Sequence, residues 1–151
     1  MRSKREWHSH IKAHNGYRSK FEADVAQQLE EAGVTWEYET ARIPYKNQNE
    51  PNGIYIPDFK VIRDDGSVFF IEAKGWINHK AACKMTAVKW HNPDLDIRFV
   101  FQSGTGKVAK LKSTNLQWAK RLRFLAAVKD IPAEWLAEER EPRRRFPNYW
   151  Y

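Results

Sequence analysis

Three charged residues could form a catalytic site on a pair of adjacent strands. Asp58 lies in one apolar segment, and Glu72 and Lys74 lie two residues apart in the next. The sequence Asp-Asp-Gly at positions 64–66 separates the two segments and predicts a β-hairpin. If the turn is centred on Asp65, Asp58 lies opposite Glu72, and Lys74 shares their side of the hairpin. A two-residue turn at positions 65 and 66 would shift the pairing by one residue and separate the three side chains.

Opposed carboxylates at this hairpin would repel each other unless a cation lies between them. Ligation by oxygen atoms alone favours Mg²⁺ or Mn²⁺ over zinc. Such an ion activates water and stabilises both oxygens exchanged at a phosphodiester, while Lys74 could orient the water or stabilise negative charge on the phosphate. The alternative is a surface hairpin with an ordinary salt bridge between Glu72 and Lys74. The apolar neighbours favour a buried strand, where unpaired charges are costly, and therefore favour the metal-dependent nuclease.

Glu22 is a possible third carboxylate, but a structural role is the simpler interpretation of its surroundings. Residues 18–32 are predicted to be helical because Phe21, Val25 and Leu29 recur at helical spacing before a glycine. Ser19 and Glu22 fit a capping box, with the serine as N-cap and the glutamate as the N3 residue. Residue type and spacing leave both roles open for Glu22.

The predicted elements indicate an α/β fold in which helices flank a mixed central sheet. Strands are expected at residues 34–39, 54–62, 67–74 and 95–101, and helices at residues 18–32, 78–90 and 114–128. Residues 44–53 and 103–113 are expected to be irregular because they are polar and contain proline or glycine. The last helix is expected to be buried through Trp118, Leu122 and Leu125.

The composition is that of one folded, basic domain. The chain has 151 residues, of which 42% are hydrophobic, and its formal net charge is +7. We expect a nuclease domain at residues 17–136 between a basic arm at 1–16 and a tail at 137–151. The positive charge favours nucleic acid as the partner, although charge alone is weak evidence.

The single cysteine and the absence of long apolar runs limit the other possibilities. Cys83 cannot form a disulfide within the chain or a Cys-rich zinc site, which fits a reducing cytoplasm. No apolar run is long enough to span a membrane, so we expect a cytoplasmic protein without a membrane partner. Residues 104–107 lack the full phosphate-loop pattern, and we expect no nucleotide cofactor.

Basic residues outside the hairpin are candidate DNA contacts. The segment from Ser103 to Val128 contains basic residues but no acidic ones. For each single residue, a solvated surface position is an equally good interpretation. The predicted contacts are Arg2, Lys4, Arg5, Lys12, Lys80, Lys84, Lys107, Lys110 and Lys112.

A series of motifs between residues 17 and 136 follows the order of one known family. The motifs are Tyr17–Glu22, Glu37–Glu39, Ile43–Tyr45, Pro57–Phe59, Glu72–Gly75, Pro93–Arg98 and Ile131–Trp135. In these motifs the chain resembles the phage endonuclease I enzymes, which resolve four-way (Holliday) DNA junctions. The resemblance is more specific than the short pattern of two carboxylates and a lysine that many nucleases share.

The resemblance implies a fold like that of restriction endonucleases and an active site with two divalent metals. Glu22, Asp58 and Glu72 would bind the metals, Mg²⁺ or Mn²⁺, and Lys74 would be catalytic. It also implies an intertwined homodimer that exchanges the N-terminal helix and first strand, so that Glu22 completes the partner's site. Branched DNA is the implied substrate, in the cytoplasm of the host cell.

The sequence leaves other functions open beside a junction-cutting endonuclease. A related nicking or repair nuclease would prefer another DNA shape. A basic module could hold branched DNA without cutting it, and an RNA-binding protein would have an equally basic surface. The carboxylates favour an enzyme, because binding a phosphate does not require negative side chains.

Overall fold

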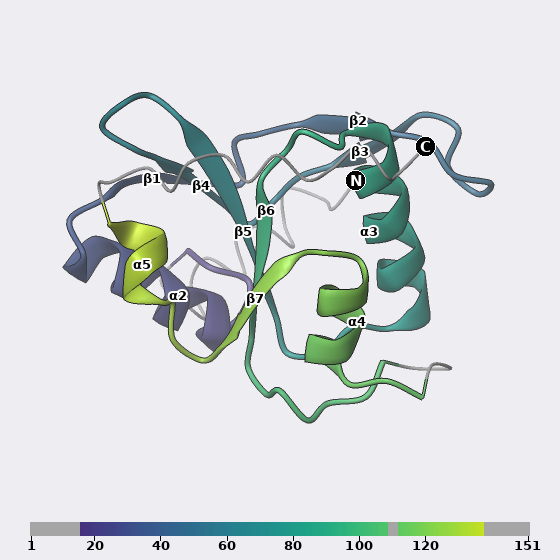
Figure 1. Cartoon of the computed structure of the whole chain (residues 1–151). Helices are drawn as coiled ribbons and strands as arrows, with labels where there is room; N and C mark the ends of the chain where they lie inside the picture. Colours follow the sequence, from purple (N-terminus) through teal and green to yellow (C-terminus); the bar gives the residue numbers. More distant parts are fainter. Residues whose placement is uncertain (1–15, 109–111, 138–151) are drawn as a thin grey trace.

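A five-stranded mixed sheet forms the centre of the computed structural model, which describes residues 16–108 and 112–137. Its strands, in their order across the sheet, are β1 (Thr35–Tyr38), β4 (Phe59–Ile62), β5 (Val68–Lys74), β6 (Ile97–Phe101) and β7 (Leu125–Val128) (Figure 1). Strands β1, β4 and β5 are antiparallel, and β5, β6 and β7 are parallel. The predicted mixed sheet flanked by helices is therefore confirmed.

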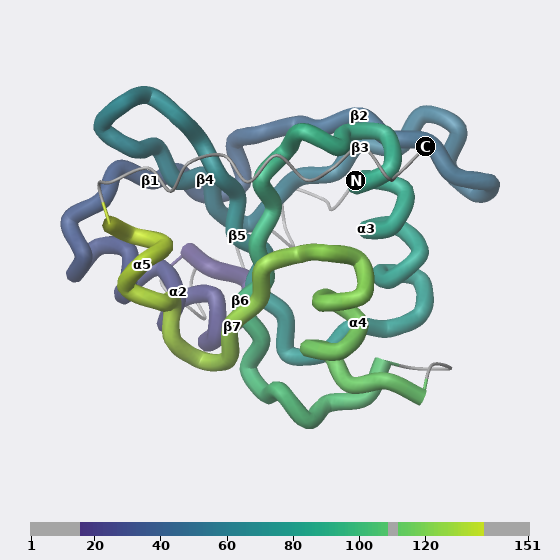
Figure 2. The backbone as a smooth tube through the Cα atoms, viewed as in Figure 1, coloured from purple at the N-terminus to yellow at the C-terminus, as the bar shows by residue number. Residues whose placement is uncertain are grey.

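Helices cover both faces of this sheet. Figures 1 and 2 show α2 (Lys20–Glu31) and α5 (Ala133–Leu136) on one side, with α3 (His79–His91) and α4 (Asn115–Arg121) on the other. A small hairpin of β2 (Ile43–Tyr45) and β3 (Gly53–Tyr55) packs against α3.

Each face of the sheet has its own apolar core, because successive strand residues point to opposite faces. Phe99 and Phe101 join Trp118 on the side of α3 and α4. Val100 joins Val25 on the side of α2 and α5. Residues of β6 therefore alternate between the two cores, and the core that holds α2 against the sheet also contains Phe59, the first residue of β4.

The first two predicted helices each begin at a capping side chain, and Ser19 is the predicted cap of the first. The Ser19 hydroxyl accepts a hydrogen bond from the backbone N–H of Glu22, and the Asn78 side chain accepts one from Ala81. Beyond the end of α2, Gly33 has a φ of +70°, a conformation that glycine adopts readily. Both helices match their predicted ranges to within two residues.

The single strand predicted at 54–62 is wrong, because this segment forms two strands in different sheets. β3 pairs with β2, whereas β4 pairs with β1 and β5. Pro57 lies between them and has no N–H for a sheet ladder, which explains why pairing changes there. Pro44 and Tyr45, expected to be irregular, belong to β2.

The helix predicted at 114–128 is also wrong over its second half. α4 ends at Arg121, and the chain then forms β7, which pairs in parallel with β6. Trp118 is buried as predicted and Leu122 is partly buried, but Leu125 is 47% exposed and Phe124 is buried in its place. The backbone of residues 125–128 forms hydrogen bonds with the edge of β6, and the spacing of apolar residues along the sequence does not reveal such a distant partner. Within the described ranges, no helix has the length and apolar character needed to cross a bilayer.

Candidate active site

The hairpin of β4 and β5 has the register that brings the predicted residues together. Phe59 pairs with Ile71, and Ile62 pairs with Val68 at the turn end. This register places Asp58, directly before β4, opposite Glu72. The backbone N–H of Ala73 donates to Asp58 Oδ2 over 2.8 Å. Both carboxylates are buried, with Asp58 6% and Glu72 4% exposed.

Lys74 lies on the same side of β5 as Glu72 and forms an ion pair with it. The distance between Lys74 Nζ and Glu72 Oε1 is 3.1 Å, and the lysine side chain remains partly exposed. The negative charge of Glu72 is the main cause that raises the pKa of Lys74, followed by that of Asp58. The lysine is therefore held as an ammonium at neutral pH, which suits it to stabilise charge on a phosphate.

Glu22 also reaches this site, from the first turn of α2. Its Oε2 accepts a hydrogen bond of 2.6 Å from the Tyr38 hydroxyl and one of 3.3 Å from the backbone N–H of Arg18. Its backbone N–H is meanwhile bound by the Ser19 cap. Glu22 thus serves the helix start through its backbone, while the charge of its carboxylate raises the pKa of Asp58.

Burial and repulsion from neighbouring carboxylates destabilise the ionised form of Asp58. Burial is the largest cause that raises its pKa well above the usual range, and the charges of Glu72 and Glu22 raise it further. Lys74 and the Ala73 N–H act in the opposite direction but do not cancel these effects. Three acidic side chains therefore lie close enough to repel one another, and the positive charge of Lys74 offsets this repulsion only in part.

The donor chemistry fits a hard divalent cation. Buried carboxylate oxygens are the ligands that Mg²⁺ and Mn²⁺ prefer, and a cation would relieve the repulsion around Asp58. In the residues that the structure covers, no group of three or more His, Cys, Asp or Glu side chains is already arranged around a common ion position. Glu72 Oε1 is bound to Lys74, so binding of an ion requires a local side-chain adjustment.

Sequence reasoning missed two tyrosines that contact these carboxylates. The Tyr55 hydroxyl donates to Glu72 Oε2 over 2.6 Å, and Tyr38 donates to Glu22. Burial is the main cause that raises the pKa of each phenol, so both remain protonated donors. The signal available was that the hydroxyl of a tyrosine in a strand that is at least partly buried needs a hydrogen-bond partner. The identity of that partner could not be read from spacing.

The candidate DNA contacts differ in their surroundings. Lys80, Lys107 and Lys112 are exposed. Lys84 is half-buried, and its Nζ lies 5.7 Å from the ring centroids of both Tyr45 and Tyr55. It therefore packs over two aromatic rings, of which that of Tyr55 carries the hydroxyl bound to Glu72. The other predicted contacts lie outside the described residues: Arg2, Lys4, Arg5, Lys12 and Lys110.

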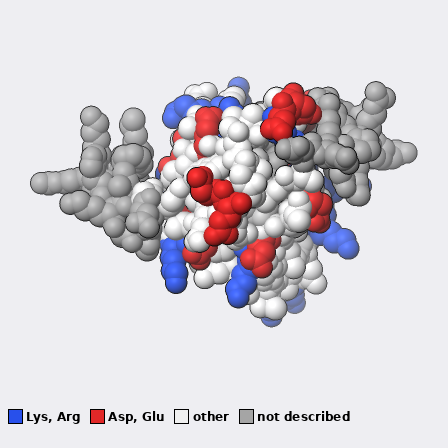
Figure 3. Space-filling model, turned by 90° about the vertical axis from the view of Figure 1, so that its left-hand side faces the viewer, with Lys and Arg blue, Asp and Glu red and all other residues white. Residues whose placement is uncertain are grey.

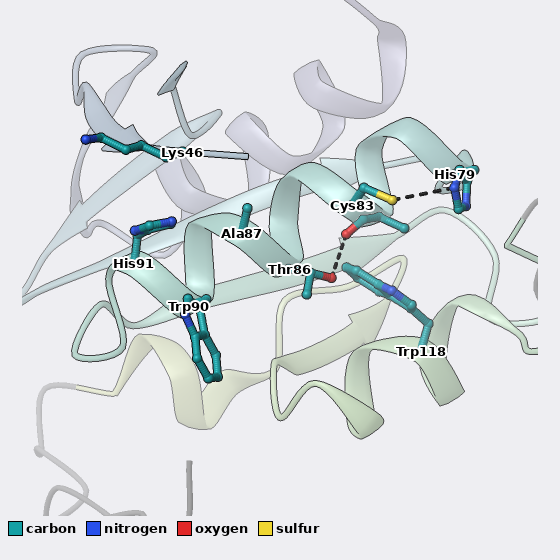
Figure 4. A pocket seen from close by; sticks show the side chains of 9 residues that line it. Lys46, His79, Cys83, Thr86, Ala87, Trp90, His91 and Trp118 are labelled. Carbon is teal, nitrogen blue, oxygen red and sulfur yellow. Dashed lines mark hydrogen bonds between the residues drawn. The ribbon is translucent and has the colours of Figure 1, made fainter. Parts of the chain in front are cut away.

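Two further surface features are an acidic patch and an open groove. Figure 3 shows acidic side chains across the middle of the face that carries β1, α2 and α5, with basic side chains mostly at its margin. Along α3 runs an open groove of about 460 Å³, lined among others by Cys83, Trp90 and Trp118 (Figure 4). None of the candidate site carboxylates lines this groove.

Removing the charge of Asp58 should stabilise the metal-free protein. A carboxyl whose pKa is higher in the folded than in the unfolded chain weakens the fold as pH rises through that range. Asp58→Asn should therefore raise the melting temperature by a few degrees at neutral pH in a chelating buffer, measured by calorimetry. Added Mg²⁺ should stabilise the wild type but not this variant.

The matched control is Asp64→Asn, which removes an exposed carboxylate from the turn of the same hairpin. Its melting temperature and its response to Mg²⁺ should follow the wild type. A lower melting temperature for Asp58→Asn without metal would contradict the electrostatic account of this site.

Comparison with known proteins gives a consistent result. A family model described as phage endonuclease I matches residues 4–147. The endodeoxyribonuclease 1 of Enterobacteria phage T3 is 36% identical over 132 residues, which cover 87% of this chain and 82% of that protein. The endonuclease I of Escherichia phage T7 is 33% identical over 138 residues, which cover 91% and 87%.

Proposed function

This chain belongs to the phage endonuclease I family and is an endodeoxyribonuclease, and on that basis we propose that it cuts branched DNA, above all four-way junctions. The proposed reaction is metal-dependent hydrolysis of a phosphodiester, with paired nicks on opposing strands. The observation that carries it is the buried pair Asp58 and Glu72 on one hairpin, with Lys74 Nζ 3.1 Å from Glu72 Oε1. A merely DNA-binding module has no use for buried carboxylates beside a phosphate.

Each site residue has a distinct role in this proposal. Glu22, Asp58 and Glu72 hold Mg²⁺ or Mn²⁺, with two ions per active site. The bound metal lowers the pKa of water and neutralises the charge that develops on the phosphate. The Ala73 N–H fixes one oxygen of Asp58 and so orients the other. Lys74, held as an ammonium beside Glu72, donates to the phosphate or positions the water.

Two active sites in one particle suit paired nicks on opposing strands, and a symmetric homodimer provides them. We propose a dimer of restriction-endonuclease-like folds that exchange α2 and β1. An exchange of identical segments preserves the contacts made within one chain, so Glu22 would meet the partner's Asp58 in the same geometry. The contacts of Glu22 with Arg18 and Tyr38 fit such an exchange, because all three residues belong to the exchanged segment.

Cleavage of a synthetic four-way junction tests the function directly. With Mg²⁺, we expect paired cuts in the junction and much slower cutting of a linear duplex of the same sequence, as seen on a denaturing gel. Equal cutting of nicked or mismatched duplex would indicate a nicking or repair nuclease instead. Binding of the junction without any cut, or preference for the corresponding RNA, would overturn the proposal.

Complementation between two inactive variants tests the exchanged dimer. Glu22→Ala and Glu72→Ala homodimers should each be inactive. If Glu22 serves the partner's site, co-folding the two variants should produce heterodimers in which one site is intact and the other carries both changes. Such heterodimers should nick one strand of a junction but fail to make the paired cut.

The result for an unexchanged arrangement is different. If each Glu22 serves its own chain, both sites of the heterodimer carry one change, and no activity returns. Heterodimer formation is verified with two affinity tags purified in sequence, and a wild-type and Glu72→Ala heterodimer controls for one intact site. A verified heterodimer without nicking activity would rule out the exchange while leaving the nuclease function intact.

A further inference from the structure

We propose that Tyr38 and Tyr55 are positioning residues that hold Glu22 and Glu72 in the arrangement required to bind metal. Each phenol donates a short hydrogen bond to one carboxylate oxygen and so limits rotation of that side chain. This proposal rests on the metal-dependent function proposed above. It assigns the two tyrosines no contact with the reacting atoms.

Tyr55 fixes Glu72 from inside the protein. The tyrosine is 2% exposed, and its hydroxyl lies 2.6 Å from Glu72 Oε2. Lys74 binds the other oxygen, Oε1, from the more exposed side. Both oxygens of Glu72 therefore have a defined partner, and rotation of the carboxylate would leave a buried hydroxyl unsatisfied. When Lys74 moves toward a phosphate, Tyr55 still holds Glu72 in place.

Tyr38 fixes Glu22 across the junction of α2 and β1. It is the last residue of β1 and pairs with Phe59, the neighbour of Asp58. Its ring packs at 5.4 Å from the ring of Phe59 and at 4.9 Å, edge to face, from that of Tyr17. The ring is thus immobilised by aromatic contacts, and its hydroxyl presents a fixed donor to Glu22 Oε2 at 2.6 Å.

Glu39, the residue after Tyr38, connects Tyr38 and Glu22 to Asp58. Its backbone N–H donates to the Asp58 carbonyl over 2.9 Å, and its side chain pairs with Arg18 at 2.7 Å. The backbone N–H of Arg18 in turn donates to Glu22. Glu39 has a φ of 54°, a left-handed conformation uncommon for a residue other than glycine, and such positions cluster at functional sites. One short segment therefore fixes both Glu22 and Asp58.

The hydroxyl and not the ring carries the proposed role, so phenylalanine is the informative replacement. Loss of a hydrogen-bond partner behind a metal ligand typically weakens metal affinity by about 10- to 100-fold. Tyr55→Phe and Tyr38→Phe should each raise the dissociation constant for Mn²⁺ within this range. The double variant should bind more weakly than either single variant.

Tyr45→Phe is a matched control. Tyr45 is also buried, its hydroxyl also donates to a glutamate, Glu50, and its ring also lies beneath Lys84. The carboxylate that it binds belongs to the loop after β2 and not to the hairpin that carries Asp58 and Glu72. This variant therefore removes the same kind of bond in the same packing environment, and its metal affinity should equal that of the wild type.

The experiment is calorimetric titration of the full-length protein with Mn²⁺ in the absence of DNA, followed by junction cleavage over a range of Mg²⁺ concentrations. We expect the half-saturating Mg²⁺ concentration to rise in Tyr38→Phe and Tyr55→Phe, with most of the wild-type rate regained at saturation. Melting temperatures, measured in a chelating buffer, identify any variant that fails to fold.

The outcomes separate this proposal from the function on which it rests. If the wild type binds no Mn²⁺, the metal-dependent function fails. If the wild type binds and both folded variants bind equally well, the positioning role is overturned and the tyrosines are structural. A rate loss that saturating Mg²⁺ does not restore, with unchanged affinity, would also overturn it.

Discussion

Asp58→Asn and Glu72→Gln should each reduce junction cleavage by more than about a hundredfold while leaving junction binding intact. Both side chains are buried on one hairpin, and each would lose a charged ligand oxygen without a large change in volume. The loss should exceed the 10- to 100-fold cost usual for a residue that only supports a ligand. Single-turnover cleavage with saturating Mg²⁺ measures the rate, and a gel shift with Ca²⁺ in place of Mg²⁺ measures the binding.

Binding in these variants should equal or exceed that of the wild type, because a negative charge near the phosphate has been removed. Asp64→Asn again provides the control, since it neutralises an exposed carboxylate on the same hairpin and should cut normally. Wild-type cleavage by either site variant would end the account in which Asp58 and Glu72 hold the metal. Melting temperatures show whether a variant that fails to cut is still folded. If a variant is unfolded, Asp58→Ala or Glu72→Ala replaces it in the same measurement.

Lys74→Ala should lower the cleavage rate by about 10²- to 10³-fold, the usual cost of losing one donor that stabilises charge in a transition state. The ammonium lies 3.1 Å from Glu72, and the neighbouring carboxylates raise its pKa despite partial burial, so it stays positively charged at neutral pH. Affinity for Mn²⁺ should not fall, since Lys74 repels a cation and competes for Glu72 Oε1. Single-turnover rates and calorimetric titration measure the two effects separately.

Lys74→Arg should not restore the rate, because a planar guanidinium does not replace a compact ammonium in this partly buried position. Lys60→Ala is the control: Lys60 is in the adjacent strand β4, and its Nζ lies 3.6 Å from Glu37. Loss of that surface ion pair should change stability by no more than about 1 kcal/mol and leave the rate unchanged. A near wild-type rate in Lys74→Ala would reduce Lys74 to a salt-bridge partner of Glu72.

Local sequence determined the part of the site that lies on one hairpin. The sequence allowed two turns between these strands, and the structure has the one centred on Asp65. Ile62 then pairs with Val68, and that register brings Asp58 opposite Glu72. The cap of α2 was predictable for the same reason, since Ser19 acts on a residue three positions away. In each case the interacting groups are close neighbours along the chain or are joined by one short turn.

Tertiary structure decided the features that depend on partners far along the chain. The range 54–62 has the local pattern of one strand, but its second half pairs with β1 and β5 as the separate strand β4. The range 114–128 has the local pattern of one helix, but its last residues pair with β6 as strand β7. Glu22 fits a helix cap equally well with or without a role at the site. Only the packing of α2 against β5 brings its carboxylate to the Tyr38 hydroxyl and close enough to Asp58 to raise its pKa. Hydrogen bonding and desolvation act over a few ångströms in space, and separation along the sequence does not report that distance.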